Sequence, residues 1–115
     1  MAIFLLKKSY QVSNQKEIGF KDLWGSRGVF TTIRLLGKPG KLILFKSHFK
    51  GLIKSLKKYQ IYSKNIEKNI KHLIYSSLKK NINYDHLLRV ALTKKILSIS
   101  IRKRFKPKKN FELKL

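Results

Sequence analysis

The sequence is defined first by what it lacks. It contains no cysteine, which excludes a disulfide framework and a thiolate metal site. Its three histidines, His48, His72 and His86, are far apart and show no metal-ligand spacing, so we predict no metal. No apolar run approaches the ~20 residues that a membrane-spanning helix needs. We therefore expect no membrane association and a cytoplasmic location.

Acidic residues are also scarce. Five Asp and Glu face 28 Lys and Arg, and the formal net charge is +23. Such an excess predicts an anionic partner, either nucleic acid or a membrane surface, and it allows non-specific binding to nucleic acid. A second explanation stays open, because lysine far outnumbers arginine, isoleucine and asparagine are plentiful, and alanine is nearly absent. Codon bias in an A/T-rich genome would produce the same composition.

The apolar pattern predicts an α+β domain. In chain order it predicts a strand over 2–6, a loop over 13–28, a hairpin of 29–36 and 41–45 around a turn at 37–40, helices that start after Ser47 and Ser63, and a hairpin of 87–93 and 96–102. This order is typical of two helices packed against an antiparallel β-sheet. Four side chains of the loop are expected to be buried anchors: Ile18, Phe20, Leu23 and Trp24.

The C-terminal segment predicts a second unit. Residues 111–115, FELKL, alternate in polarity as a strand does, and they follow a basic stretch that resembles a linker. We therefore divide the chain into a small α+β domain over 1–105 and, over 106–115, a linker and the first strand fragment of a missing large domain.

The strand at 29–36 has two different faces. Val29, Thr31, Ile33 and Leu35 share one of them. The other face holds an aromatic ring, a hydroxyl, a guanidinium and an aliphatic chain, from Phe30, Thr32, Arg34 and Leu36. A mixed face of this kind is ordinary toward solvent, and it is also what a ligand-facing wall looks like. Phe30 as a plain core aromatic and Thr32 as a plain sheet residue remain alternatives.

Three stretches together resemble a known family. They are GVFTTIR at 28–34, LILF at 42–45 and SHFKGL at 47–52. Their order is similar to the small N-terminal domain of the class IV aminotransferases, the fold-type IV pyridoxal-phosphate enzymes. The family includes branched-chain and D-amino-acid aminotransferases and 4-amino-4-deoxychorismate lyase, which forms 4-aminobenzoate and pyruvate. The phe-thr-thr-x-arg form resembles the lyase most.

The resemblance implies a role for the mixed strand face. In the family this face lines the substrate side of the pocket, which points to Phe30, Thr32 and Arg34. The family's cofactor is pyridoxal phosphate, but its Schiff-base lysine lies in the large domain, so no catalytic residue is assigned here. The family's phosphate-binding arginine corresponds to Gly51, with Lys50 beside it, so no cofactor-binding residue is assigned either. The implied partners are a large pyridoxal-phosphate domain or an intact homologue, in a homodimer.

Two functions from different classes follow. The first is a truncated small domain of a pyridoxal-phosphate lyase or transferase, inactive alone. The alternative is a small basic nucleic-acid-binding, ribosome-associated protein, which the net charge and five tyrosines favour. Against it, the sequence has no aromatic-rich RNA-binding segment, GXXG loop or zinc knuckle. A degenerate domain kept as a partner for an intact homologue is a third possibility.

Overall fold

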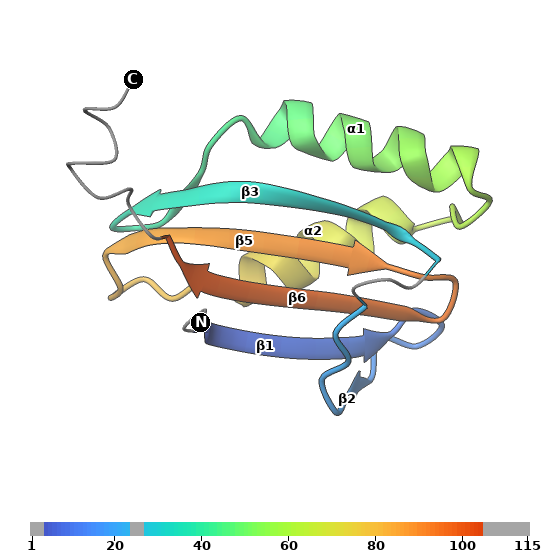
Figure 1. The fold of residues 1–115 in the computed structure, drawn as a ribbon, viewed down its shortest axis with the longest axis horizontal. Helices are drawn as coiled ribbons and strands as arrows, with labels where there is room; N and C mark the ends of the chain where they lie inside the picture. Colours follow the sequence, from blue (N-terminus) through green and yellow to red (C-terminus); the bar gives the residue numbers. More distant parts are fainter. Residues whose placement is uncertain (1–3, 24–26, 105–115) are drawn as a thin grey trace, which may run out of the picture.

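An antiparallel sheet with two helices forms the fold, as described for residues 4–23 and 27–104 by a computed structural model (Figure 1). The predicted α+β class is confirmed. The elements are β1 (Phe4–Gln11), β2 (Glu17–Ile18), β3 (Val29–Gly37), β4 (Lys41–Leu42), α1 (Phe45–Lys58), α2 (Ile66–Ser76), β5 (Tyr84–Leu92) and β6 (Ile96–Lys103).

Four long strands carry the sheet, whose order is β2-β1-β6-β5-β3-β4. β3 pairs with β5 along its whole length, from Val29 opposite Leu92 to Gly37 opposite Tyr84. The tight turn between β5 and β6 makes them a hairpin, and β1 lies antiparallel on the other side of β6. β1 and β6, the first and last strands among the described residues, therefore become neighbours, which no local pattern indicates.

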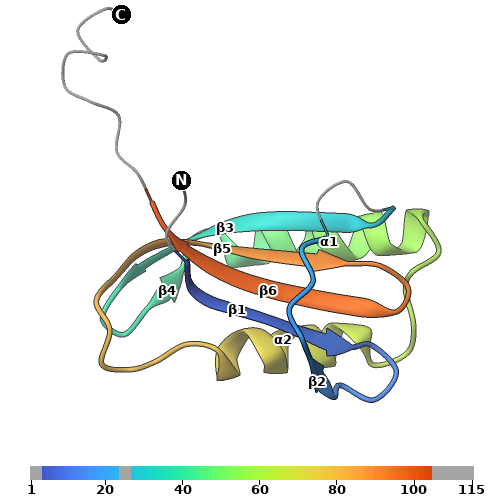
Figure 2. The same cartoon turned by 60° about the horizontal axis from the view of Figure 1, so that its bottom comes forward.

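Both helices lie on the same side of the sheet (Figure 2). Each has an apolar stripe at helical spacing, and the stripe is the part that is buried. The buried stripes comprise Phe49, Leu52, Ile53 and Leu56 in α1, and Ile66, Ile70, Leu73 and Ile74 in α2. They share one core with buried strand residues that include Leu35, Leu88, Val90 and Ile99. No helix in the described ranges has the length and apolar character needed to cross a bilayer.

The helices begin at positions other than those predicted from Ser47 and Ser63. α1 starts at Phe45, after Leu44 in a left-handed conformation (φ 54°), and no side chain caps it. The strand predicted over 41–45 is also shorter, and only β4 is formed. The Ile43 amide still donates to the Arg34 carbonyl of β3, but the chain turns at the next residue, Leu44. α2 follows Asn65, which is also left-handed (φ 71°).

The other boundaries differ by a few residues. The first strand extends to Gln11, beyond the predicted 2–6, because its second half pairs with β6. β5 begins at Tyr84, earlier than the predicted 87–93, and the Tyr84 side chain is buried. The predicted loop over 13–28 contains β2.

The predicted anchors of that loop are less buried than expected. Ile18, Phe20 and Leu23 are only half-buried, because this segment lies along the edge and outer face of the sheet and not in the core. Trp24 lies outside the described residues. So does the predicted linker and strand fragment over 106–115, which includes the predicted strand over 111–115.

Candidate functional site

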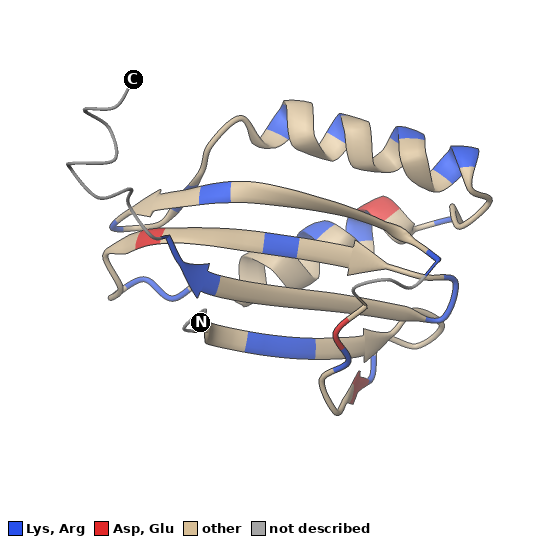
Figure 3. Ribbon diagram, viewed as in Figure 1, with Lys and Arg blue, Asp and Glu red and all other residues tan. Residues whose placement is uncertain are grey.

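The sheet face away from both helices carries basic, hydroxyl and aromatic side chains. Opposed residues on neighbouring strands project to the same side, so the strand register defines rows across this face. Two such rows are Thr32–Arg89–Ser100–Lys7 and Arg34–Leu87–Arg102. Figure 3 shows a basic segment on each of β1, β3, β5 and β6. We call this surface, with Phe30 at one end, the uncovered face.

All three residues predicted as a pocket wall lie on the uncovered face. Phe30, Thr32 and Arg34 alternate along β3 with the buried Val29 and Ile33. Phe30 is 58% exposed, so the alternative that it is a core aromatic is wrong. The structure brings these three residues together on one surface, and their role in binding a ligand stays a prediction.

Phe30 has a basic neighbour that the sequence did not indicate. The Arg89 guanidinium carbon lies 5.0 Å from the centre of the Phe30 ring, within the range of a cation–π contact. An Arg89 nitrogen also lies 3.6 Å from a carboxylate oxygen of Asp22. The Arg89 side chain is only 21% exposed, so most of its surface packs against neighbouring residues.

Arg34 is held more loosely. Its nearest acidic partner is Asp85, with a nitrogen–oxygen distance of 3.9 Å, too long for a hydrogen bond. Both side chains are about 40% exposed to solvent, and an exposed ion pair of this kind contributes about 1 kcal/mol or less. The Arg34 guanidinium therefore has N–H donors that Asp85 does not use.

A chain segment closes one end of the uncovered face. The Ser98 hydroxyl donates to the Lys21 carbonyl at 2.8 Å, and the Lys21 amide donates to the Ser9 hydroxyl at 2.9 Å. The Ser9 and Ser98 hydroxyls lie 2.7 Å apart, and both side chains are buried. In Figure 1 the segment after β2 passes in front of β6. The open part of the face is therefore the part around Thr32 and Arg34.

The close approach of two strands explains why residue 28, in the GVFTT stretch, is a glycine. A Cβ atom at Gly28 would lie 2.2 Å from the Leu92 carbonyl oxygen, a distance no side chain permits. Gly28 thus allows β3 to enter the sheet close against the end of β5. This places Phe30 opposite Ala91 in the strand register.

The described residues hold no group of three or more metal-ligating side chains. His48 lies in the first turn of α1, with its Nδ1 3.4 Å from the Thr31 hydroxyl. His86 lies on the helix side of β5, opposite Leu35. Burial lowers the pKa of His86 below its usual value of 6.5; Asp85 partly opposes this shift and Lys103 reinforces it. These histidines are separate, and they do not form a catalytic pair.

The position that corresponds to the family's phosphate-binding arginine is unsuited to a phosphate. Gly51 lies on the exposed side of α1, and a Cβ built there meets no atom within 4 Å. It therefore offers neither a side chain nor an enclosing cradle. Within the described ranges, Gly51 therefore does not fit the phosphate group of pyridoxal phosphate at the position where the family has its arginine.

Sequence reasoning missed Arg89, Arg102 and Lys7 as members of the site. Arg102 follows the serines of β6 in an alternating pattern, so its side of the strand was evident. The pairing of this predicted hairpin with β3 on one side and β1 on the other was not evident, because both contacts are long-range.

Comparisons with protein-family models, with curated proteins and with solved structures each returned no match for this chain.

Proposed function

We propose that this chain acts as the small domain of a fold-type IV pyridoxal-phosphate enzyme, in which the uncovered face forms one wall of the ligand pocket. The single observation that carries the proposal is the placement of Phe30, Thr32 and Arg34 on the side of the sheet opposite the helices. Within the class, the phe-thr-thr form favours the aminodeoxychorismate lyase type over the aminotransferase types.

The chemistry of the uncovered face suits an anionic, planar ligand. Arginine offers paired N–H donors that match a carboxylate, and Arg34 and Arg102 are separated by one strand, at Leu87. The exposed Phe30 ring adds an apolar surface next to them. A single sheet face encloses no ligand, whereas binding pockets bury most of their ligand, so a second body must cover this face.

The proposal requires that the chain alone be inactive. In the family the lysine that forms the covalent bond with the cofactor lies in the large domain, and covalent catalysis cannot proceed without that nucleophile. The unsuitability of Gly51 for a phosphate points the same way. Turnover of an amino acid or of aminodeoxychorismate by the purified 115-residue chain with added cofactor would contradict the proposal.

A binding experiment tests the pocket wall directly. The ¹⁵N-labelled chain is titrated with 4-aminobenzoate and with pyruvate, and amide shifts are followed by NMR. We expect shifts on the uncovered face, around Thr32 and Arg34, which weaken severalfold in Arg34→Gln. Lys54→Gln, which removes one charge from the helix layer, is the matched control and should change nothing. Shifts confined to the helices, or equal binding by both variants, would reject the assignment of this face.

A second candidate, a nucleic-acid-binding module, is favoured by one observation. Phe30 is exposed on a sheet beside Arg89, an arrangement that suits stacking of an unpaired base. Titration with single-stranded RNA at several salt concentrations distinguishes the two. Binding that falls severalfold in Phe30→Ala, and steeply with salt, would favour this candidate over a pocket wall.

A further inference from the structure

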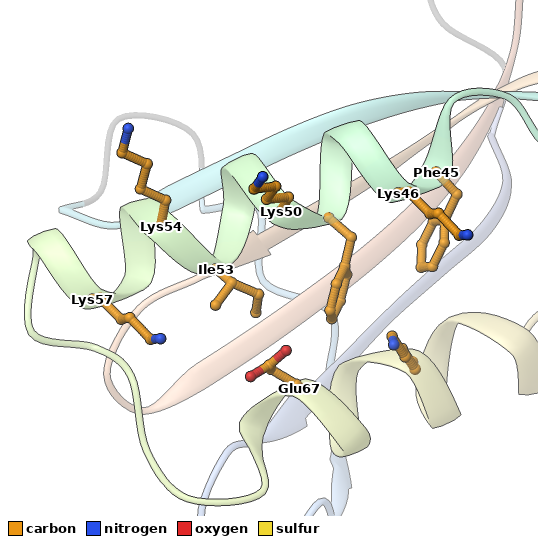
Figure 4. Close-up of a pocket in the computed structure, with 9 residues that line it drawn as sticks. Phe45, Lys46, Lys50, Ile53, Lys54, Lys57 and Glu67 are labelled. Carbon is orange, nitrogen blue, oxygen red and sulfur yellow. The ribbon is translucent and has the colours of Figure 1, made fainter.

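A groove of about 480 Å³ lies between α1 and α2 (Figure 4). Its floor is apolar and formed by Phe45, Phe49 and Ile53 of α1. Phe49 and Ile53 are 7% and 8% exposed, so the floor is recessed below the surface. The groove lies in the helix layer, on the opposite side of the sheet from the uncovered face (Figure 2).

Lysines form the rim of this groove. Four come from α1 and one from α2: Lys46, Lys50, Lys54, Lys57 and Lys71. All five side chains are exposed, and Lys71 Nζ lies over the Phe49 ring of the floor, 4.9 Å from its centre. The surface is therefore an apolar trough between positive edges, and charge complementarity calls for a partner with an apolar ridge between negative edges.

One acidic side chain interrupts the positive rim. Glu67 of α2 points toward Ile53 of α1 in Figure 4. Its carboxylate accepts a hydrogen bond of 2.9 Å from the Tyr62 hydroxyl, and Lys57 Nζ lies 4.8 Å from the centre of the Tyr62 ring. Glu67 thus places one negative charge among the lysines at the end of the groove near Ile53.

The geometry separates three classes of anionic partner. Phe49 offers no free ring face for a stacked base, because it contacts the Phe45 ring at 5.3 Å and Lys71 Nζ at 4.9 Å. A lipid surface would need protruding apolar side chains, whereas Phe49 and Ile53 are recessed. A peptide helix presents a protruding apolar ridge that a recessed floor accommodates.

We propose that the groove binds an acidic amphipathic helix from a partner protein. The lining along α1, from Phe45 to Lys57, extends roughly 18 Å, enough for about three turns of a bound helix. Apolar residues at i, i+3, i+4 and i+7 of the partner enter the floor, and its Asp and Glu residues face the lysine rim.

The apolar ridge and the acidic edges have different roles in this complex. Exposed ion pairs contribute little to stability. The partner's apolar side chains, which become buried against the groove floor, therefore supply most of the affinity. The lysine rim accelerates association and excludes basic partners. Affinity should therefore depend on both the pattern and the charge of the peptide.

The probe is a fluorescein-labelled synthetic peptide of about four helical turns, with leucine at i, i+3, i+4 and i+7 and glutamate at most other positions. A second peptide has the same composition with the leucines dispersed around the helix. Anisotropy is measured with the full chain, with Lys50→Glu/Lys54→Glu, and with Lys64→Glu/Lys68→Glu. The last variant has the same net charge, but its substitutions are exposed and outside the groove lining.

We expect the amphipathic peptide to bind about tenfold more tightly than the dispersed one, because only it presents a ridge to the floor. The groove variant should lose about tenfold in affinity and the matched variant less than about twofold. Equal binding of both peptides, or equal loss in both variants, would reduce the interaction to general charge attraction and overturn the proposal. Tighter binding of single-stranded RNA or of anionic phosphatidylserine vesicles, weakened by the same groove variant, would overturn it too.

Discussion

The two layers of this molecule carry their positive charge in different ways. Between residues 45 and 80, which include both helices, the chain has ten lysines, no arginine and a single acidic residue, Glu67. The uncovered face instead carries Arg34, Arg89 and Arg102, three of the five arginines in the sequence. The helix layer presents point charges around an apolar groove, and the sheet presents guanidinium groups beside an aromatic ring.

This difference limits what composition alone explains. A uniform codon bias would distribute lysine and arginine without regard to the faces of the fold. It accounts for the abundance of lysine in the helix layer, but it does not account for three arginines that project to the same side of three adjacent strands. The arginines are therefore the better guide to a binding surface, since arginine is preferred where an anion is recognised by paired hydrogen bonds.

The largest expected effect comes from two adjacent leucines that point to opposite faces of β5. Leu88 is fully buried beneath the helices, and Leu87 is half-buried on the uncovered face. Leu88→Ala should lower the free energy of unfolding by about 2–5 kcal/mol, and Leu87→Ala by about 1 kcal/mol or less. Urea denaturation measures both. Equal losses of unfolding free energy in the two variants would contradict the difference between the two sheet faces. They would mean that another protein or a second copy of the chain covers the uncovered face in solution.

Two glycines give the next effect. Gly28→Ala forces a methyl group against the Leu92 carbonyl oxygen and should cost about 2–3 kcal/mol of stability. Gly51→Ala adds a methyl group in open space on α1 and should stabilise the protein by up to about 1 kcal/mol, since alanine is the better helix former. The midpoints of thermal unfolding of both variants, compared with that of the unaltered chain, measure these opposite changes in stability. A tolerated Gly28→Ala would show that β3 enters the sheet less closely than described.

The smallest effect concerns His86. Because burial lowers its pKa in the folded state, the unfolded chain binds the proton more readily. Folding stability should therefore begin to fall as the pH drops below 6.5, and this loss should be complete below the folded-state pKa. His86→Gln should show a shallower decline between about pH 8 and about pH 5. Parallel curves for the two proteins would remove His86 as a source of pH dependence.

Local patterns predicted the elements of the fold well, and their ends poorly. The alternation over 29–36 matches β3, and the stripe of Phe49, Leu52 and Leu56 matches α1. Helix starts were placed by the preference of serine for capping, but left-handed residues at Leu44 and Asn65 start the helices without a side-chain cap. This turn geometry depends on the packing of the elements on either side, and that packing is not visible in a short window of sequence.

For the candidate site, the alternation along β3 was enough to place Phe30, Thr32 and Arg34 on one side of a strand. It could not supply Arg89 as the partner of the Phe30 ring, because the two residues are 59 positions apart in the chain and meet only through the β3–β5 register. The groove between the helices was likewise invisible, since each helix alone shows only an apolar stripe and exposed lysines.

The sequence by itself determined the α+β class, the two faces of the strand at 29–36 and the large positive charge, because periodicity and composition are local properties. Only the tertiary structure decided which strands became neighbours, which sheet face the helices left uncovered, and that the lysines of two helices flank one groove. Those features arise when long-range pairing and burial choose one arrangement of the elements, and this choice is made by the chain as a whole.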